Sequence, residues 1–133
     1  MIVGFTGTRT GMNDKQKHLV KIFLKMHRPS RVVHGDCIGA DSDFHNICLE
    51  LKIPIDIRPS NLSTRAWRHA TGVLYLPKNP LERNRDIVDQ SDEMFACPKE
   101  INEVLRSGTW SAIRYARRIN KRLYIFYQDG SHD

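Results

Sequence analysis

Short runs rich in β-branched residues alternate along this chain with longer segments whose apolar residues have helical spacing. Five runs are expected to form strands: residues 2–6, 31–34, 55–57, 94–97 and 123–127. Strands separated by helix-length segments favour βαβ units, whose right-handed crossovers build a parallel sheet with helices on its faces. The pattern therefore predicts an α/β fold with a doubly wound, mainly parallel sheet that is flanked by helices.

Helices are expected in four of the segments that follow or separate these strands. The first begins at Asp14, a suitable N-cap, and ends near His27. The other three are expected at residues 40–51, 80–90 and 109–119. Residues 58–80 are the least regular part of the chain. Within them, residues 65–69 suggest a helical turn, and residues 73–76 form either a strand or a packed loop.

Length and composition indicate one domain that spans residues 1–133, because the sequence has no repeat, low-complexity tract or linker. With 40% hydrophobic and 27% charged residues, the composition is typical of a soluble globular protein. No apolar run approaches the ~20 residues that a membrane span needs. No secretory signal is visible, and three cysteines without close spacing do not form a disulfide framework. We therefore expect a cytoplasmic protein without membrane association.

The net charge of +6 favours anionic partners such as nucleotides, nucleic acid or phosphorylated metabolites. The excess is concentrated near the end of the chain. Residues 106–122 contain six basic residues and no acid: Arg106, Arg114, Arg117, Arg118, Lys121 and Arg122. The arginines at 114, 117 and 118 have an apolar counterface on the same helix, which favours a solvated helix side. Nucleic-acid contact is the alternative.

Glycine, arginine and small polar residues gather in the turns that follow strands or precede helices. These turns are Gly7-Thr8-Arg9, Gly35-Asp36, Gly39-Ala40-Asp41, Arg83-Asn84-Arg85 and Ser107-Gly108-Thr109. In a parallel sheet the strand-to-helix loops emerge at one edge, so we expect these turns to converge. Glycine allows close backbone approach, helix N-termini present free N–H groups, and arginine forks match phosphate oxygens. The sequence therefore predicts a phosphate or nucleotide site.

These motifs, in this order, also resemble a known family. GFTGTR, HGDCIGAD, ERNRDIVDQSD and RSGTWSAIRYAR together resemble the SLOG superfamily, especially its small stand-alone members related to YspA and YpsA. The superfamily is Rossmann-like and contains the lonely-guy cytokinin-activating enzymes and DNA-processing protein A. The resemblance implies that Gly7 and Arg9 lie against a phosphate. It also implies that the Gly39-Ala40-Asp41 turn contacts base or ribose, that Arg83 matches the active-site arginine of the lonely-guy enzymes, and that the 107–109 turn wraps the phosphate.

One position departs from the enzymes of this family. Lonely-guy enzymes carry PGGxGTxxE, and Ala112 stands here where that glutamate belongs. Cleavage of a base–ribose bond needs a carboxylate near the ribose. Asp36, Asp41 and Glu82 are the acids near enough in the motifs to replace it. If the chain is an enzyme, Asp41 and Arg83 are the expected catalytic residues.

Two further features have competing interpretations. Trp110 follows the Ser-Gly-Thr turn and either stacks on a base or packs in the core against the last strand. His34 and Cys37, like His45 and Cys48, have a spacing found in zinc sites, but Cys48 falls on the apolar helix face with Phe44. Core cysteines and a surface histidine explain the pattern better, so no metal or other cofactor is expected.

The leading hypothesis is a domain that binds a nucleotide or nucleotide-derived phosphorylated ligand at the carboxyl ends of the strands, as a sensor or processor. The first alternative is a nucleoside-monophosphate phosphoribohydrolase, or N-glycosidase. The second is single-stranded nucleic-acid binding through residues 106–122. Members of the superfamily commonly form dimers, so we also expect a homo-oligomer, and residues 74–76 are a candidate interface.

Overall fold

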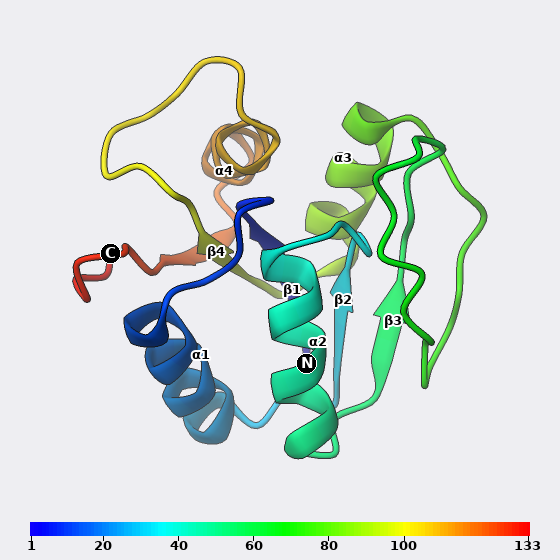
Figure 1. Ribbon diagram of the computed structural model, residues 1–133, viewed down its shortest axis with the longest axis horizontal. Coiled ribbons are helices and arrows are strands. Elements are labelled where there is room, and N and C mark those ends of the chain that lie inside the picture. The colour runs from blue at the N-terminus through cyan, green and yellow to red at the C-terminus, as the bar shows by residue number, and fades with distance from the viewer.

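The computed structural model describes residues 1–133 and contains five strands and four helices (Figure 1). In chain order these are β1 (Ile2–Gly7), α1 (Asp14–His27), β2 (Arg31–His34), α2 (Ala40–Glu50), β3 (Ile55–Ile57), α3 (Pro80–Gln90), β4 (Glu93–Cys97), α4 (Gly108–Arg118) and β5 (Arg122–Ile125). The expected alternation of strands and helices along the chain is confirmed. None of the helices combines the length and apolar character that crossing a bilayer requires.

All five strands are parallel and lie in the order β3-β2-β1-β4-β5. The chain builds one half of the sheet from β1 through β2 to β3 and then returns to the other side of β1 with β4. The strand order therefore reverses between β1 and β4, and Gly7 pairs with Cys97 at the carboxyl ends of these two strands. In open α/β sheets, ligands bind outside the strand ends at such a reversal.

Helices cover both faces of the sheet, α1 and α2 on one face and α3 and α4 on the other (Figure 1). The larger core lies under α1 and α2, where the ring of Phe5 stacks on that of Phe44 with centroids 4.2 Å apart. The face under α3 and α4 has two smaller clusters, one around Val88 and Met94 and one around Trp110. Burial on both faces explains why the strands are short apolar runs rather than alternating ones.

Several boundaries differ from the sequence-based expectation in instructive ways. Helix α1 is capped by Asn13, not by Asp14: the Asn13 side chain accepts from the Gln16 N–H, and the Gln16 side chain accepts from the Asn13 N–H. This reciprocal capping box satisfies two N–H groups, which a single Asp14 cap would not. Strand β4 begins one residue earlier than expected, and β5 ends at Ile125 instead of residue 127.

Residues 58–79, which we call the strap, contain neither a helix nor a strand. The helical turn expected at residues 65–69 is absent, because the backbone N–H groups of this stretch bind Asp36 instead of carbonyls within a helix. The Asp36 carbonyl accepts from the Ala66 N–H, and its carboxylate accepts from the Arg68 N–H. Further along, Val73 and Tyr75 make backbone hydrogen bonds to Ile57. Of the two alternatives for residues 73–76, the structure has a loop that runs along the outer edge of β3, with one isolated bridge between Ile57 and Leu74 and with most of its side chains exposed.

Candidate ligand site

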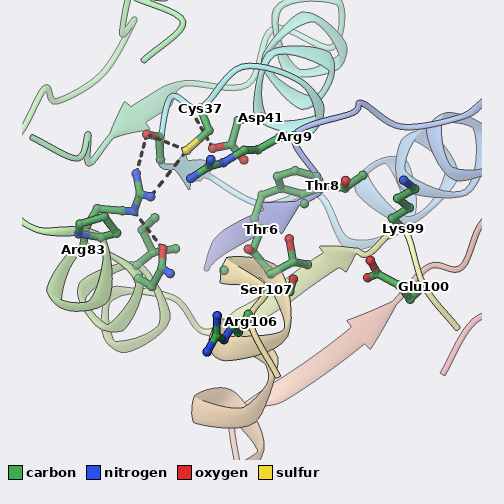
Figure 2. Close-up of a pocket in the computed structure, with 18 residues that line it drawn as sticks. Thr6, Thr8, Arg9, Cys37, Asp41, Arg83, Lys99, Glu100, Arg106 and Ser107 are labelled. Atoms are coloured by element: carbon green, nitrogen blue, oxygen red, sulfur yellow. Dashed lines mark hydrogen bonds between the residues drawn. The ribbon is translucent and has the colours of Figure 1, made fainter. Parts of the chain in front are cut away.

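A cavity of about 350 Å³ opens at the carboxyl ends of β1 and β4, where the strand order reverses (Figure 2). We call it the strand-end cavity. Its walls are mostly polar and come from five separate parts of the chain. They are Phe5, Thr6, Gly7, Thr8, Arg9, Gly35, Cys37, Asp41, Pro80, Arg83, Asn84, Ile87, Lys99, Glu100, Arg106, Ser107, Gly108 and Thr109. The structure thus brings the expected turns together at one site.

The turn after β1 is held against the start of α2 by close backbone contact. The Thr8 N–H donates to the Cys97 carbonyl, and the Thr8 carbonyl accepts from the Ala40 N–H. Gly39 has φ of 93°, and a Cβ there would lie 2.2 Å from the Arg9 carbonyl oxygen. Only glycine fits such a position without strain. Neither Gly39 nor Ala40 lines the cavity; they fix the loop of residues 7–9, which does.

Helix α4 presents free N–H groups to the cavity. Ser107 caps the helix by accepting from the Trp110 N–H at 3.2 Å, whereas the N–H groups of Gly108 and Thr109 have no acceptor within the chain. A Cβ on Gly108 would meet no atom within 4 Å, so packing does not explain a glycine there. The helix start is an open, partly positive surface of the kind that binds anions.

Arg83 is the most constrained basic residue of the site. Its side chain comes from the first turn of α3, is only 6% exposed, and reaches across to the loop after β2. Nη1 donates to the Gly35 carbonyl at 2.7 Å, Nε donates to Asn84 Oδ1 at 2.9 Å, and Nη2 approaches Cys37 Sγ at 3.5 Å. Arg83 makes no ion pair with any carboxylate.

Asp41 is the buried carboxyl group of the cavity. It lies in the first turn of α2, is 5% exposed, and accepts from the Cys37 N–H at 3.0 Å. Burial raises the pKa of this carboxyl to about 6, although the Cys37 hydrogen bond and the Arg83 charge both favour the ionised form. Such a group is able to exchange a proton near neutral pH. Burial also raises the pKa of the Cys37 thiol, so this thiol stays protonated.

Lys99 and Glu100 line the cavity but were not singled out by the sequence analysis, which placed Arg106 only among the basic residues of 106–122 (Figure 2). All three lie in the loop between β4 and α4. The available signals were the position of Lys99 and Glu100 just after a central strand and that of Arg106 just before the Ser-Gly-Thr turn. Arg114 braces this loop by donating to the carbonyls of Val104 and Leu105, and it pairs with Glu103 at 3.1 Å. It is therefore not simply part of a solvated helix side.

Several expected ligand contacts lie elsewhere. Trp110 does not stack on a ligand here: it is 2% exposed, packs in the core near β5, and donates from its indole nitrogen to Glu100. Arg85 lies between α3 and α4 and does not line the cavity, because two helical positions after Arg83 turn its side chain by about 200°. Ala112 is buried and also faces away from the cavity.

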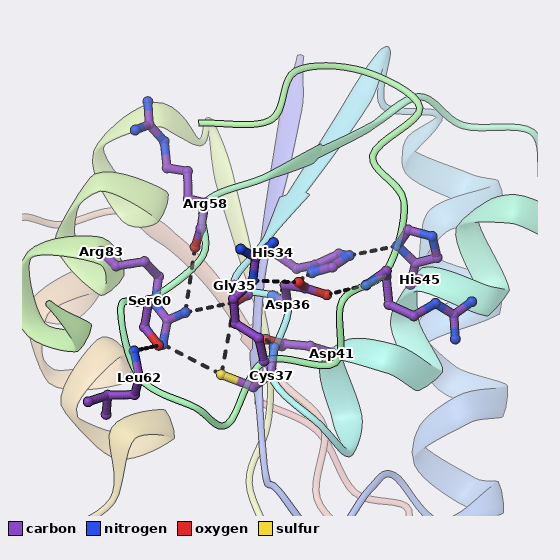
Figure 3. A network of polar contacts seen from close by, with 12 residues as sticks. His34, Gly35, Asp36, Cys37, Asp41, His45, Arg58, Ser60, Leu62 and Arg83 are labelled. Carbon is purple, nitrogen blue, oxygen red and sulfur yellow. Dashed lines mark hydrogen bonds and ion pairs between the residues drawn. The ribbon is translucent and has the colours of Figure 1, made fainter. Parts of the chain in front are cut away.

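Asp36 has a structural role behind the cavity (Figure 3). It is fully buried, has φ of 58°, and forms an ion pair with Arg65 at 3.1 Å. Of the acids considered as replacements for the absent glutamate, neither Asp36 nor Glu82 lines the cavity, whereas Asp41 does. Glu100 is a second acid at the wall, but its carboxylate already accepts from the Trp110 indole.

The histidines of the zinc-like spacings bind each other (Figure 3). The Asp36 N–H donates to Nδ1 of His34, so Nε2 of His34 carries the proton and donates to Nδ1 of His45 at 2.9 Å. Burial and the nearby His45 lower the pKa of His34 to about 3, so it is neutral. Cys48 lies in the core, and no group of three or more His, Cys, Asp or Glu side chains is arranged to hold a metal.

Comparison with known proteins gives no family for this chain. No protein-family model matches the sequence, and no curated protein is significantly similar to it. The class of protein is therefore defined by the fold and the site alone: a single-domain, doubly wound α/β protein with a polar cavity at its strand reversal.

Proposed function

We propose that this protein binds a nucleotide or nucleotide-derived phosphorylated ligand in the strand-end cavity, as a sensor or processor. The observation that carries the proposal is the buried guanidinium of Arg83, which has no carboxylate partner. A buried charge is costly unless it is paired. Its neutral partners satisfy part of the guanidinium fork, and a phosphate in the cavity supplies the missing negative charge.

The rest of the cavity supports an anionic ligand. Arg9, Lys99 and Arg106 line the wall, and none of them is in an ion pair. The free N–H groups at the start of α4 add partial positive charge on the same side. Gly108 leaves open space above these groups, as close approach of phosphate oxygens requires. The resemblance to SLOG domains agrees with this assignment.

The test is a thermal-shift screen of the full chain against nucleoside mono-, di- and cyclic phosphates, followed by calorimetric titration of the hits. A bound ligand raises the melting temperature by mass action. Arg83→Met keeps an unbranched apolar stem but removes the guanidinium group and its charge, and we expect it to weaken binding at least tenfold. Arg117→Gln is the matched control, because Arg117 is solvent-exposed and lies outside the strand-end cavity. The proposal fails if no nucleotide binds, or if both variants bind as the wild type does.

A second candidate, hydrolysis of the N-glycosidic bond of a nucleoside monophosphate, is favoured by Asp41. Its carboxyl group faces the cavity, and its raised pKa suits a group that stabilises an oxocarbenium-like state or positions water. Release of free base from a nucleotide panel, lost in Asp41→Asn while the ligand still binds, is the expected result. Ligand binding without release of base would assign the protein to sensing.

Self-association through the strap remains a prediction. Leu74 is 58% exposed and Leu76 is 86% exposed, so both side chains are accessible to a partner. Analytical ultracentrifugation of the wild type and of Leu74→Ser/Leu76→Ser compares the oligomeric states directly.

A further inference from the structure

A second cavity of about 370 Å³ lies between α3 and α4. We call it the helix groove. It is lined by Leu81, Asn84, Arg85, Ser111, Ala112, Arg114, Tyr115 and Arg118. Every charged side chain in this lining is an arginine. The groove therefore offers a positive surface beside the strand-end cavity, and nothing in the proposed function uses it.

Two of the three arginines have no carboxylate partner. Arg85 and Arg118 make no ion pair, and both guanidinium groups lie 5.3 Å from the centroid of the Tyr115 ring. The Tyr115 hydroxyl donates to Asp89, which fixes the ring between them. Cation–π contacts hold the two side chains in place but leave their N–H donors available. Arg114 differs, because it is paired with Glu103.

Asn84 connects the groove to the strand-end cavity, since it lines both. Its Oδ1 accepts from Arg83 Nε, and this fixes the orientation of the amide because an arginine nitrogen only donates. The amide nitrogen of Asn84 has no acceptor within the chain. Two free N–H donors therefore lie where the two cavities adjoin.

The spacing of the two cavities suits one extended ligand. The first is built on Gly108 and Thr109, and the second begins at Ser111, three residues or about 4.5 Å along α4 from Gly108. Helix side chains lean toward the N-terminus, so the long arginine side chains of the second and third turns reach back toward this point. Because the cavities adjoin at Asn84, two phosphates that flank a single ribose can reach one cavity each.

We propose that the ligand carries a second phosphate, which the helix groove binds while the first occupies the strand-end cavity. The inference rests on the proposed function and narrows its ligand class to a nucleoside 3′,5′-bisphosphate unit. Such a unit occurs as a free small molecule and as the 5′-phosphorylated end of a single-stranded oligonucleotide. Asn84 contacts the ribose or the linking oxygen, and Arg85 and Arg118 bind the second phosphate. A second copy of this chain is a poor occupant of the groove, because a symmetric contact would place the arginines of one copy against those of the other.

The test compares ligands that differ by one phosphate. The affinity of the full chain is measured by calorimetry at fixed low salt for adenosine and guanosine 5′-monophosphates and for the corresponding 3′,5′-bisphosphates. A 5′-phosphorylated dinucleotide and a 5′-phosphorylated hexanucleotide form the second arm. We expect the better bisphosphate to bind at least tenfold more tightly than its monophosphate. If the bisphosphate and the hexanucleotide bind with equal affinity, the ligand is the small molecule. If the hexanucleotide binds more tightly than the bisphosphate, the ligand is the 5′-phosphorylated end of a strand.

The groove is tested with neighbouring arginines of α4. Arg118→Gln and Arg85→Gln should remove most of the gain from the second phosphate and leave monophosphate affinity within twofold. Arg117→Gln removes the same charge outside the groove and should keep the gain. If the monophosphate binds but the second phosphate adds nothing, or if Arg117→Gln and Arg118→Gln lose the gain equally, this inference is wrong while the proposed function stands. If neither ligand binds, this inference is wrong, and the wider nucleotide screen decides the proposed function.

Discussion

The guanidinium group of Arg83 lies against the backbone of Gly35. Nη1 donates to the Gly35 carbonyl at 2.7 Å, and a Cβ at position 35 would lie 2.5 Å from that same nitrogen. Glycine at 35 thus leaves room for the arginine, and the arginine is fixed where it lines the cavity. The loop after β2 and the first turn of α3 are linked through this pair, although 48 positions separate them in sequence.

Gly35→Ala is expected to displace the Arg83 side chain. The destabilisation should be about 1–2 kcal/mol, because the clash is with the end of a flexible side chain. Nucleotide affinity should fall more, toward that of Arg83→Met. A double-mutant cycle by calorimetry checks the link: in the Arg83→Met background, Gly35→Ala should cause no further loss of binding. Additive losses would show that Gly35 acts independently of Arg83.

Gly108→Ala and Gly7→Ala should have opposite effects on stability. The Cβ at 108 meets no atom within 4 Å, and alanine favours helix over glycine by up to about 1 kcal/mol, so the melting temperature should stay or rise. Nucleotide affinity should nevertheless fall, because the methyl group occupies the space for phosphate. At position 7 the Cβ would lie 2.5 Å from that of Ala40, and we expect about 1–3 kcal/mol of destabilisation. Urea unfolding and calorimetry measure both effects.

Asp41→Asn should change the pH dependence of stability. The folded-state pKa of Asp41 is about 6 against an ordinary value of 3.8, so the folded protein holds this proton more tightly than the unfolded chain. Its contribution is fully favourable below pH 3.8 and is lost as pH rises to about 6. The pKa difference of about 2 corresponds to a penalty of up to about 3 kcal/mol at pH 7.

The asparagine variant lacks that penalty and can still accept from the Cys37 N–H. Its advantage over the wild type should therefore grow between pH 5 and pH 7, as measured by urea unfolding at each pH. Asp14→Asn, at an exposed position on α1, is the control and should follow the wild-type profile. Parallel profiles for Asp41→Asn and the wild type would contradict a raised pKa.

Asp36→Asn is expected to loosen the strap. Asparagine tolerates the positive φ at this position but leaves Arg65 without its buried counter-charge, which costs about 3 kcal/mol. Hydrogen exchange should accelerate at the amides of residues 64–68. Glu103→Gln removes one partner of an exposed ion pair and should change stability by less than about 1 kcal/mol. Equal effects of the two variants would mean that Asp36 does not anchor the strap.

The sequence was most informative where a local signal and the tertiary structure agree. Pro80 marks the first residue of α3, as predicted, because proline suits the start of a helix, and α4 begins within one residue of its predicted start. The convergence of the turns followed from parallel strands alone. The cap of α1 was misassigned because Asn13 and Asp14 are both good N-caps, and the choice depends on Gln16 and on a contact from Asn13 to the distant Gln128.

The remaining errors concern long-range contacts. The path of the strap is set by the carboxylates of Asp36 and Asp56, which accept from backbone N–H groups of Arg68 and Val73, and no local pattern encodes these partners. The role of Trp110 was ambiguous for the same reason, because the local pattern does not show which part of the chain covers its side chain. Lys99 and Arg106 line the cavity because α4 packs beside β4, a relationship that the loop sequence does not reveal.

The strap also determines how this molecule meets others. By hydrogen bonding to Ile55 and Ile57, residues 72–75 occupy the donors and acceptors that an outermost strand would otherwise expose. Another chain is therefore unable to extend the sheet at β3, which removes a common route to runaway polymerisation. Assembly on this flank, where it occurs, has to proceed through the strap rather than through β3.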